Sequence, residues 1–469
     1  MPTRKYTYYD YTVSLCPECL KRIDAKIVFE DNNVYMLKRC PEHGNSKVLI
    51  ADDIAYYKNI RNYNKPSETP YKFNTSTHYG CPYDCGLCPD HEQHSCLTII
   101  EITDRCNLTC PTCYAGSSPT FGRHRTLEEV KTMLDTIVAN EKEPDVVQIS
   151  GGEPTLHPHF FEILDYAKTL PIKHIMVNTN GIEIAKDFEF AKRLKSYSPD
   201  FEIYLQFDSF KEDALIFLRG ADLRRIREKA LEHLNELNLS TTLVVTLQKG
   251  LNDDEIGKTI EFALKQKCVR GVTFQPTQIA GRLDNFREET NRITLTEVRR
   301  KILEQTDLFN ADDLIPVPCN PDALMMGYVL KLNGNNFPLT RYINPTDLLD
   351  NSKNTIVYEQ DQELHRKMFE IFSTGTSTDK ATAKLNNLLC CLPFVEAPNL
   401  SYDNLFRIII MQFIDAHNFD VRAIKKSCVH IVDKDNKIIP FETMNLFYRD
   451  NKKEYLEILK SETIQTSNK

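Results

Sequence analysis

The sequence predicts an α/β protein whose centre is a partial (β/α) barrel of six parallel strands. The prediction rests on apolar, strand-like runs that alternate with helical patterns between residues 97 and 275, because each return to a parallel strand needs a crossover. A flat, doubly wound sheet would produce the same alternation, so the strand order stays open. The expected strands are residues 97–103, 146–150, 174–179, 202–207, 241–247 and 270–275, and the expected helices lie near 126–140, 158–169, 184–196, 212–237 and 253–267.

Composition limits what the chain can be. Its 469 residues carry 58 Lys and Arg against 66 Asp and Glu, for a formal charge of −8, and 41% are hydrophobic. That content supports a folded core rather than disorder. The mild negative charge argues against a dedicated nucleic-acid binder, which needs a basic surface. We expect a metal module in residues 1–72, a four-cysteine loop in 73–96, the barrel in 97–300 and a mixed C-terminal domain in 301–469.

The sequence shows neither a secretory signal nor a membrane-spanning segment. The polar, aromatic start MPTRKYTYYDYT is unlike a secretory signal, and no run approaches 18 apolar residues. We therefore expect a cytoplasmic protein, with peripheral contact at the inner membrane face as an alternative. Cytosolic thiols stay reduced, so the 15 cysteines indicate metal sites rather than disulfides.

The first 72 residues carry two short metal-binding knuckles. These are Cys16-Pro-Glu-Cys19 and Cys40-Pro-Glu-His43. Three sulfurs and one nitrogen can close a tetrahedral site that holds a single zinc or a rubredoxin-like iron. A structural staple is the expected role, because a module of this size has little core of its own; a redox iron that relays electrons is the alternative.

Four further cysteines precede the barrel within sixteen residues. They are Cys81, Cys85, Cys88 and Cys96. Four thiolates form a closed ligand set, suited to an auxiliary [4Fe-4S] cluster for electron transfer or to zinc. We expect the neighbouring His91 and His94 to be solvated loop residues.

A three-cysteine loop follows the first expected barrel strand. Its cysteines are Cys106, Cys110 and Cys113, at the end of the barrel where active sites form. Three thiolates can hold three irons of a cubane cluster and leave the fourth iron open to a ligand. The alternative is a zinc site completed by another residue, such as His124.

The other strand ends carry polar residues that would surround this loop. Two glycines after the second strand would let a ligand approach the backbone, and the glutamate beside them could accept from a cationic amine. One polar strand end alone would be an ordinary turn, but four polar strand ends beside a three-cysteine loop indicate a binding site. These residues are Gly151, Gly152, Glu153, Asn178, Asn180, Gln206, Asp208 and Gln275.

The three-cysteine loop, GGEP and the polar strand ends together resemble the radical S-adenosylmethionine (radical SAM) superfamily over about residues 97–280. The resemblance implies that Cys106, Cys110 and Cys113 hold a [4Fe-4S] cluster whose open iron binds SAM. It implies a reaction that cleaves SAM and abstracts hydrogen through a 5′-deoxyadenosyl radical. It places Gly151, Gly152 and Glu153 at the methionine amine, and Asn178, Asn180, Gln206 and Asp208 near the ribose or the substrate. Many members have an aromatic residue where this chain has Thr112, so Tyr114 or a residue from elsewhere would pack on the adenine.

The longer stretch GCPYDCGLCPDHEQHSCLTIIEITDRCNLTCPTCYA, the segment LRGADL and the C-terminal FIDAHNFD resemble the family of archaeal-type tetraether lipid synthases and dihydropterin methylases. That family carries a third cluster on C-terminal cysteines. Ser427 and Glu442 stand here where thiolates are expected. The remaining candidate ligands are Cys319, Cys428 and one of the pair Cys390 and Cys391, which could equally be buried apolar residues.

We therefore expect a radical SAM enzyme that uses a low-potential donor such as ferredoxin or flavodoxin. The first hypothesis is coupling or modification of lipid chains. It needs an apolar tunnel, for which residues 406–414, 388–389 and 325–326 are candidates, although the same residues suit an ordinary core. The alternative is methylation of a pterin such as 7,8-dihydro-6-hydroxymethylpterin, in a flat pocket where Asp208 would face ring nitrogens. Peptide modification and a non-enzymatic zinc adaptor are more distant hypotheses.

Overall fold

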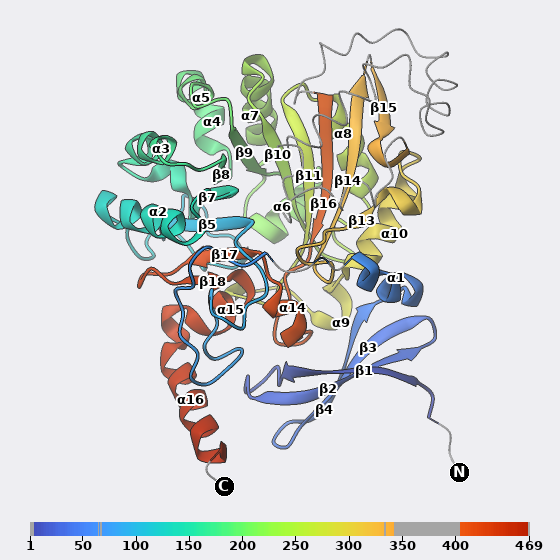
Figure 1. Cartoon of the computed structure of the whole chain (residues 1–469). Coiled ribbons are helices and arrows are strands. Elements are labelled where there is room, and N and C mark those ends of the chain that lie inside the picture. Colours follow the sequence, from blue (N-terminus) through green and yellow to red (C-terminus); the bar gives the residue numbers. More distant parts are fainter. Residues whose placement is uncertain (1–3, 64, 66–67, 333, 342–403, 468–469) are drawn as a thin grey trace, which may run out of the picture.

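The computed structural model describes the chain except for residues 1–3, 64, 66–67, 333, 342–403 and 468–469. In Figure 1 a small N-terminal sheet lies below a large central sheet, and helices line one face of the large sheet. The C-terminal helix runs beside the small sheet at the opposite end of the molecule from helices α5 and α7.

The N-terminal sheet is a four-stranded antiparallel meander in the order β1-β2-β3-β4. Its strands are β1 (Thr7–Leu15), β2 (Arg22–Glu30), β3 (Asn33–Cys40) and β4 (Gly44–Ala51). Asp31 and Asn32 both have positive φ angles, of 51° and 64°, which suits the tight turn between β2 and β3. Helix α1 (Ile54–Asn59) and the 3₁₀ turn η1 (Ile60–Tyr63) follow, and Asp53 caps α1 by accepting from the backbone N–H of Tyr56 at 2.9 Å.

The central sheet contains the six predicted parallel strands in chain order, which confirms the predicted fold class. They are β5 (Leu97–Thr103), β7 (Val146–Gly151), β8 (His174–Thr179), β9 (Phe201–Gln206), β10 (Thr241–Leu247) and β11 (Val269–Pro276). Each pairs in parallel with the next. The strands are almost wholly buried because helices cover one face and the other face lines the interior.

Helices between the strands complete the crossovers. Helix α2 begins with a capping box, in which Thr126 and Glu129 each bond the other's backbone N–H. The crossover helices are α2 (Leu127–Glu141), α3 (Phe160–Thr169), α4 (Ile182–Lys186), α5 (Phe188–Lys195), α6 (Glu212–Arg219), α7 (Arg224–Leu237) and α8 (Ile256–Lys265), with the 3₁₀ turn η2 (Pro154–Leu156) before α3.

C-terminal strands extend this sheet at both edges, which the sequence pattern did not predict. Strand β16 (Leu405–Met411) pairs in parallel with β11, and β17 (Val429–Val432) pairs in parallel with β5. No simple strand–helix repeat leads to them, and β17 has only four residues, so periodicity carries little signal for either. The other elements beyond β11 are β12 (Arg282–Leu283), α9 (Glu288–Asn291), α10 (Leu295–Gln305), η3 (Ala311–Asp313), β13 (Ile315–Pro316), β14 (Leu324–Leu332), β15 (Asn335–Pro338), η4 (Leu339–Arg341), α14 (Val421–Lys425), β18 (Ile438–Pro440), α15 (Phe441–Thr443), η8 (Met444–Tyr448), η9 (Asp450–Lys452) and α16 (Lys453–Ser467).

Alternation along the strands separates two buried layers. Val147 and Ile149 pack with helix residues, whereas Val146 belongs to the cluster on the interior face. The apolar run at residues 406–414 divides in the same way: Phe406 joins the helix-side cluster and Ile409 the interior one. Phe406 and Ile409 are therefore core, and so are residues 325–326 in β14, whereas Met411 and Phe413 line a cavity and residues 388–389 lie outside the described part of the chain.

Within the described residues, no helix is long and apolar enough to cross a membrane.

Candidate active site

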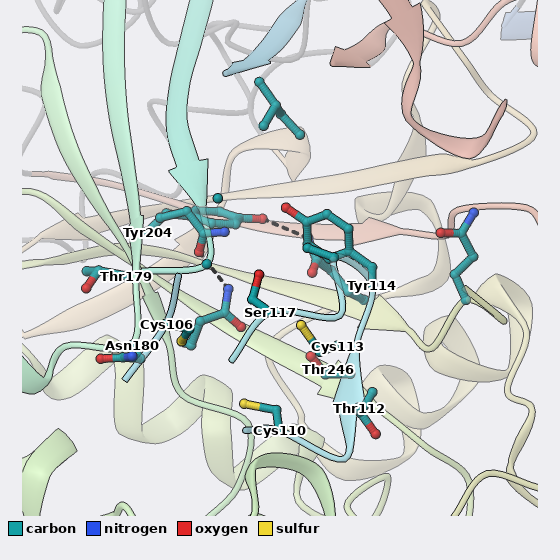
Figure 2. A pocket seen from close by; sticks show the side chains of 18 of the residues that line it. Cys106, Cys110, Thr112, Cys113, Tyr114, Ser117, Thr179, Asn180, Tyr204 and Thr246 are labelled. Carbon is teal, nitrogen blue, oxygen red and sulfur yellow. Dashed lines mark hydrogen bonds between the residues drawn. The ribbon is translucent and has the colours of Figure 1, made fainter. Parts of the chain in front are cut away.

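The three cysteines that follow β5 line one cavity at the carboxyl ends of the parallel strands. Figure 2 shows Cys106, Cys110 and Cys113 with Tyr114 and Tyr204 among the residues around it. Cys106 and Cys110 are buried, and Cys113 lies in the two-residue strand β6 (Thr112–Cys113). Burial raises the pKa of the Cys106 thiol to about 12 and also raises the pKa of Cys110. Buried thiols of this kind become thiolates when a cation binds them, so the donors fit an iron cluster.

The two glycines after β7 bring its backbone against the start of the cysteine loop. The N–H of Gly152 donates to the carbonyl of Thr103 at 2.8 Å, and the N–H of Glu153 donates to the carbonyl of Arg105 at 2.9 Å. A Cβ on Gly151 would lie 2.2 Å from the Thr103 carbonyl oxygen, and one on Gly152 would lie 2.2 Å from that of Arg105. These positions therefore require glycine for the two strand ends to meet.

Glu153 is buried, and donors of the protein itself hold its carboxylate. It accepts from the hydroxyl of Thr155 at 2.6 Å, the hydroxyl of Thr179 at 2.7 Å and the backbone N–H of Asn180 at 2.8 Å. Burial raises the pKa of this carboxyl. The residue lines the cavity as expected, but its hydrogen bonds tie β7 to β8, so the structure shows a positioning role. Asn180 continues the link by donating to the Asn107 side chain at 2.7 Å.

A chain of polar side chains crosses the strand ends. Asn178 donates to Ser150 Oγ at 3.2 Å and accepts from Gln206 Nε2 at 2.7 Å. Gln206 in turn accepts from Arg219 at 2.9 Å. Asn178, Gln206 and Arg219 all line the cavity, so the two amides predicted from the sequence are placed together, with their hydrogen bonds directed at each other.

Asp208 does not face the cavity, contrary to the sequence-based expectation. Its carboxylate accepts from Arg219 at 2.8 and 2.7 Å and from Arg227 at 2.7 Å. Burial raises the pKa of this carboxyl, but the charges of the two arginines outweigh it and the net shift is downward. The two arginines and the Thr246 N–H, which donates to Asp208 at 3.1 Å, fill the acceptor sites of this carboxylate, and the residue that reaches the cavity beside Cys110 is Arg219. Sequence reasoning did not single out Arg219 as a site residue, although it is the last residue of α6 before Gly220.

The segment that follows β11 packs against the cysteine loop and holds it in place. Strand β12 pairs with β6, which sets Arg282 opposite Cys113. The Arg282 guanidinium donates to the carbonyls of Cys110 at 2.6 Å, Gly116 at 3.2 Å and Ser117 at 2.7 Å. Only the folded chain reveals this contact, because more than 160 residues separate the partners.

An aromatic wall closes another side of the cavity. The ring of Tyr114 lies 5.0 Å from that of Phe441, and Phe441 lies 4.1 Å from Phe413. Arg449 sits over the Tyr114 ring at 5.5 Å and forms two hydrogen bonds to Glu101, at 2.6 and 2.9 Å. The wall combines residues from the cysteine loop with residues from the C-terminal region.

The cavity enclosed by these groups has a volume of about 180 Å³. The barrel strands contribute Ile99, Gln148 and Tyr204 to its lining. Gln275 also lines it, as predicted, and donates to the Tyr204 hydroxyl at 3.1 Å. Apolar and aromatic walls with a few amide groups are typical of a small-molecule site.

Comparison with known proteins places this geometry in a family. A model of the radical SAM superfamily matches residues 100–263, and a model described as the HMPTM N-terminal zinc ribbon domain matches residues 8–52. A 7,8-dihydro-6-hydroxymethylpterin dimethyltransferase of Methanocaldococcus jannaschii is 32% identical over 95% of this chain and 95% of its own length. The chain belongs to the radical SAM superfamily. It is an enzyme of the same family as this archaeal relative.

Other similarities are shorter. A GTP 3′,8-cyclase of Syntrophomonas wolfei is 28% identical over 40% of this chain and 57% of its own length. Among solved structures, Streptococcus suis SuiB bound to the precursor peptide SuiA has a TM-score of 0.40 and 17% identity, covering 46% of this chain and 47% of that chain.

The auxiliary cysteines of this radical SAM enzyme are arranged differently from the expected closed set of four. Cys96 lies with Cys319 and Cys428, with all three sulfurs within 4.8 Å of one another and the last two 3.1 Å apart. Cys96 immediately precedes β5 and Cys428 immediately precedes β17, and the pairing of Leu97 with Val429 sets the two cysteines side by side. The sequence spacing could not show this, because β17 was not predicted.

Cys81, Cys85 and Cys88 remain in the loop before β5. Among the described residues their sulfurs do not all lie within 4.8 Å of one another, and the backbone N–H of Cys85 donates to the Tyr448 hydroxyl at 2.8 Å. Cys390 and Cys391 lie outside the described residues. Ser427 and Glu442, which stand where the resemblance leads us to expect thiolates, hydrogen-bond each other at 2.9 Å in the buried region next to Cys428.

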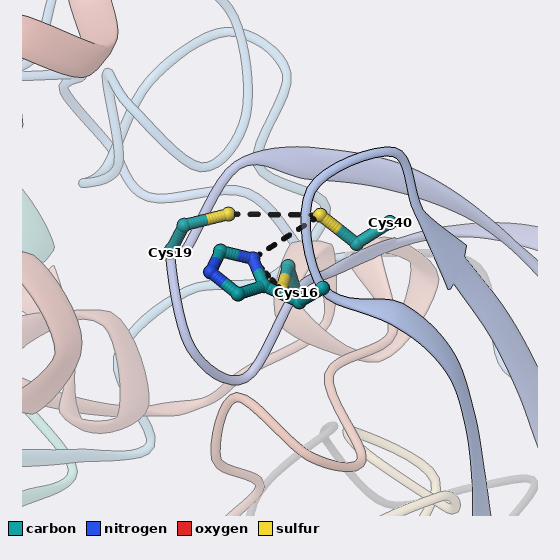
Figure 3. A group of neighbouring side chains, drawn as sticks. Cys16, Cys19 and Cys40 are labelled. Carbon is teal, nitrogen blue, oxygen red and sulfur yellow. Dashed lines mark hydrogen bonds between the residues drawn. The ribbon is translucent and has the colours of Figure 1, made fainter.

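The two N-terminal knuckles come together as the sequence predicts. Figure 3 shows the sulfurs of Cys16, Cys19 and Cys40 converging; His43 Nδ1 lies 3.5 Å from the sulfurs of Cys16 and Cys40, and the sulfurs of Cys19 and Cys40 are 3.8 Å apart. The four ligand atoms lie within 4.8 Å of one another, which fits a single tetrahedral metal ion. By contrast, His124 hydrogen-bonds Thr103 at 2.9 Å and is grouped with no cysteine among the described residues.

Proposed function

We propose that this radical SAM enzyme is a methyltransferase that acts on a dihydropterin. The observation that carries the proposal is the similarity to the pterin dimethyltransferase, which extends over 95% of both chains and therefore includes the regions outside the barrel. The match of residues 8–52 to the HMPTM zinc ribbon supports the same assignment.

The cavity has the chemistry that a flat heterocycle needs. The rings of Tyr114, Phe413 and Phe441 offer stacking surfaces. Gln148 and Gln275 offer hydrogen-bonding groups on the opposite strands.

The cysteines that line the cavity would hold the cluster and SAM. A [4Fe-4S] cluster on Cys106, Cys110 and Cys113 would supply the electron that cleaves SAM and so starts the radical reaction. The protein's own groups would position that cluster. Arg282 binds the carbonyls of the cysteine loop, and hydrogen bonds join the end of β7 to the residues that precede the loop. The cationic Arg219 beside Cys110 suits an anionic group such as the carboxylate of SAM.

Two further cysteine groups are proposed metal sites. Cys81, Cys85 and Cys88 would form one, on the strength of their close spacing in the sequence, and the buried trio Cys96, Cys319 and Cys428 would form the other. We propose auxiliary iron-sulfur clusters at these sites, electrons from a ferredoxin or flavodoxin, and zinc in the N-terminal module, whose zinc-ribbon match favours zinc over iron.

Coupling or modification of lipid chains is the less well supported activity. The comparisons favour the pterin alternative, and of the described candidates for an apolar tunnel most are packed core, with Met411 and Phe413 lining the cavity.

The test is an anaerobic assay with the full-length, iron-loaded enzyme, a chemical reductant, 7,8-dihydro-6-hydroxymethylpterin and SAM carrying a deuterated methyl group. We expect mass spectrometry to show a pterin that has gained methyl groups, and we expect Cys106→Ala to form none. If the wild-type enzyme cleaves SAM while the pterin stays unmodified, the proposal is wrong.

A further inference from the structure

Gln148 occupies an unusual place in the barrel interior. It lies in the middle of β7, in register with Ile99 on β5 and Met176 on β8. Ile99 and Met176 belong to the apolar cluster on the interior face. Gln148 therefore sets a primary amide between two apolar neighbours, and its side chain lines the active-site cavity.

Gln148 is a buried residue whose amide has no hydrogen-bond partner among the described residues. Gln148 is only 5% exposed. The neighbouring amides of Asn178, Gln206 and Gln275 each bond a side chain of the protein. Unlike those of Gln248, the Gln148 amide atoms are not among the fully buried side-chain atoms that lack a partner, so the amide opens onto the cavity, where a ligand can supply its hydrogen bonds.

We propose that Gln148 recognises the lactam edge of the pterin ring and so selects the substrate. This inference rests on the proposed function. A primary amide presents one donor and one acceptor side by side. The 4-oxo group and the N3–H of a pterin present the complementary pair. The aromatic wall formed by Phe441 and Phe413 would hold the ring while Gln148 reads its edge.

The substitution Gln148→Met tests this assignment, because it keeps the length of the side chain and removes both hydrogen-bonding groups. Gln248→Met is the matched control: Gln248 is also buried and has no partner for either side-chain atom, but it does not line the cavity. The binding measurement is anaerobic calorimetry on the iron-loaded enzyme with SAM and 7,8-dihydro-6-hydroxymethylpterin. We expect Gln148→Met to weaken binding by about ten- to a hundredfold and Gln248→Met to leave it unchanged.

A second ligand identifies the edge that is read. An analogue without the 4-oxo group should bind the wild-type enzyme at least about tenfold more weakly than the pterin, whereas Gln148→Met should bind both equally. If Gln148→Met weakens both ligands but keeps the preference, Gln148 does not read the lactam edge and the assignment is wrong.

Stability provides a readout that does not depend on the ligand. Without pterin, Gln148→Met should melt at the same temperature as the wild type or higher, because it removes an unsatisfied amide. If both Gln148→Met and Gln148→Leu melt lower or fail to fold, the fold itself needs the amide and the inference is wrong. If the wild type binds the dihydropterin and Gln148→Met binds it equally well, only this inference fails; if the wild type binds none, the proposed function fails first.

Discussion

Arg282 donates from Nε to the backbone carbonyl of Cys110 at 2.6 Å. The same guanidinium also reaches the carbonyls of Gly116 and Ser117, at 3.2 and 2.7 Å. One planar side chain therefore ties together the second half of the cysteine loop and the turn that follows it. The loop that presents the three thiols is held by a residue from the far side of the barrel, and not by its own sequence alone.

Replacing Arg282 with Lys should loosen this loop. Lysine keeps the charge but cannot donate to three carbonyls from one plane. Losing two of the three hydrogen bonds, each contributing about 1 kcal/mol, should slow SAM cleavage roughly tenfold or more. When SAM is added to the reduced enzyme, the electron paramagnetic resonance signal of the cluster should change less in Arg282→Lys than in the wild type, or its lines should be broader. The exposed Arg287→Lys is the control, and equal spectra and rates for the two variants would contradict this role of Arg282.

Gly281 should be intolerant of any side chain. Its φ angle is +63°, and a Cβ would lie 2.3 Å from the Tyr114 carbonyl oxygen. Gly281→Ala should therefore lower the free energy of unfolding by more than the roughly 1–2 kcal/mol expected from the left-handed backbone alone. Gly250→Ala separates the two effects, because Gly250 has a φ of +74° and open space around it. Urea unfolding should give Gly281→Ala a much lower free energy of unfolding than Gly250→Ala. Similar values would show that the Tyr114 carbonyl can move away from a Cβ at little cost.

Cys96 should share a metal site with Cys428 and not with Cys88. Removing one ligand should empty or weaken a site, and removing a second ligand of the same site should then cost little more. We expect iron and sulfide analysis to show the same loss for Cys96→Ala, Cys428→Ala and the double variant. The pair Cys88→Ala and Cys96→Ala should instead lose the sum of the two single losses. Cys268→Ala, a buried cysteine outside these groups, is the control for the loss of any thiol.

The reverse pattern, with Cys88 and Cys96 non-additive, would restore the closed set of four expected from spacing.

His91 is buried rather than solvated as expected from the sequence, and it should make stability depend on pH in the weakly acidic range. Burial lowers its pKa to about 4, against an ordinary value of 6.5. Because the folded state favours the neutral ring, its contribution is fully present above pH 6.5 and is lost as the pH falls toward 4. Between pH 7.5 and 5.5 the loss amounts to about 1.4 kcal/mol.

His91→Gln should therefore show a smaller fall in unfolding free energy over this interval, measured by urea denaturation. His159→Gln, which replaces an exposed histidine, should behave as the wild type. An unchanged pH dependence in His91→Gln would assign the effect to other groups.

Local pattern was enough to predict the six barrel strands and the convergence of the two N-terminal knuckles, but not the partners of Cys96. Apolar periodicity reports directly which residues face a core, and short cysteine spacings report which ligands can share a metal. The glycines of GGEP were found for the same reason, since their effect is local and steric.

Only the tertiary structure decided which distant residues meet. It moved Asp208 out of the cavity by pairing it with two arginines, and it placed Cys96 with Cys428 through a four-residue strand. It also showed that Gln148, a single polar residue within the apolar run VVQIS, faces the cavity. Partners separated by hundreds of residues leave no periodic trace in the chain, because their contact depends on strand order and on which face of the sheet each side chain occupies.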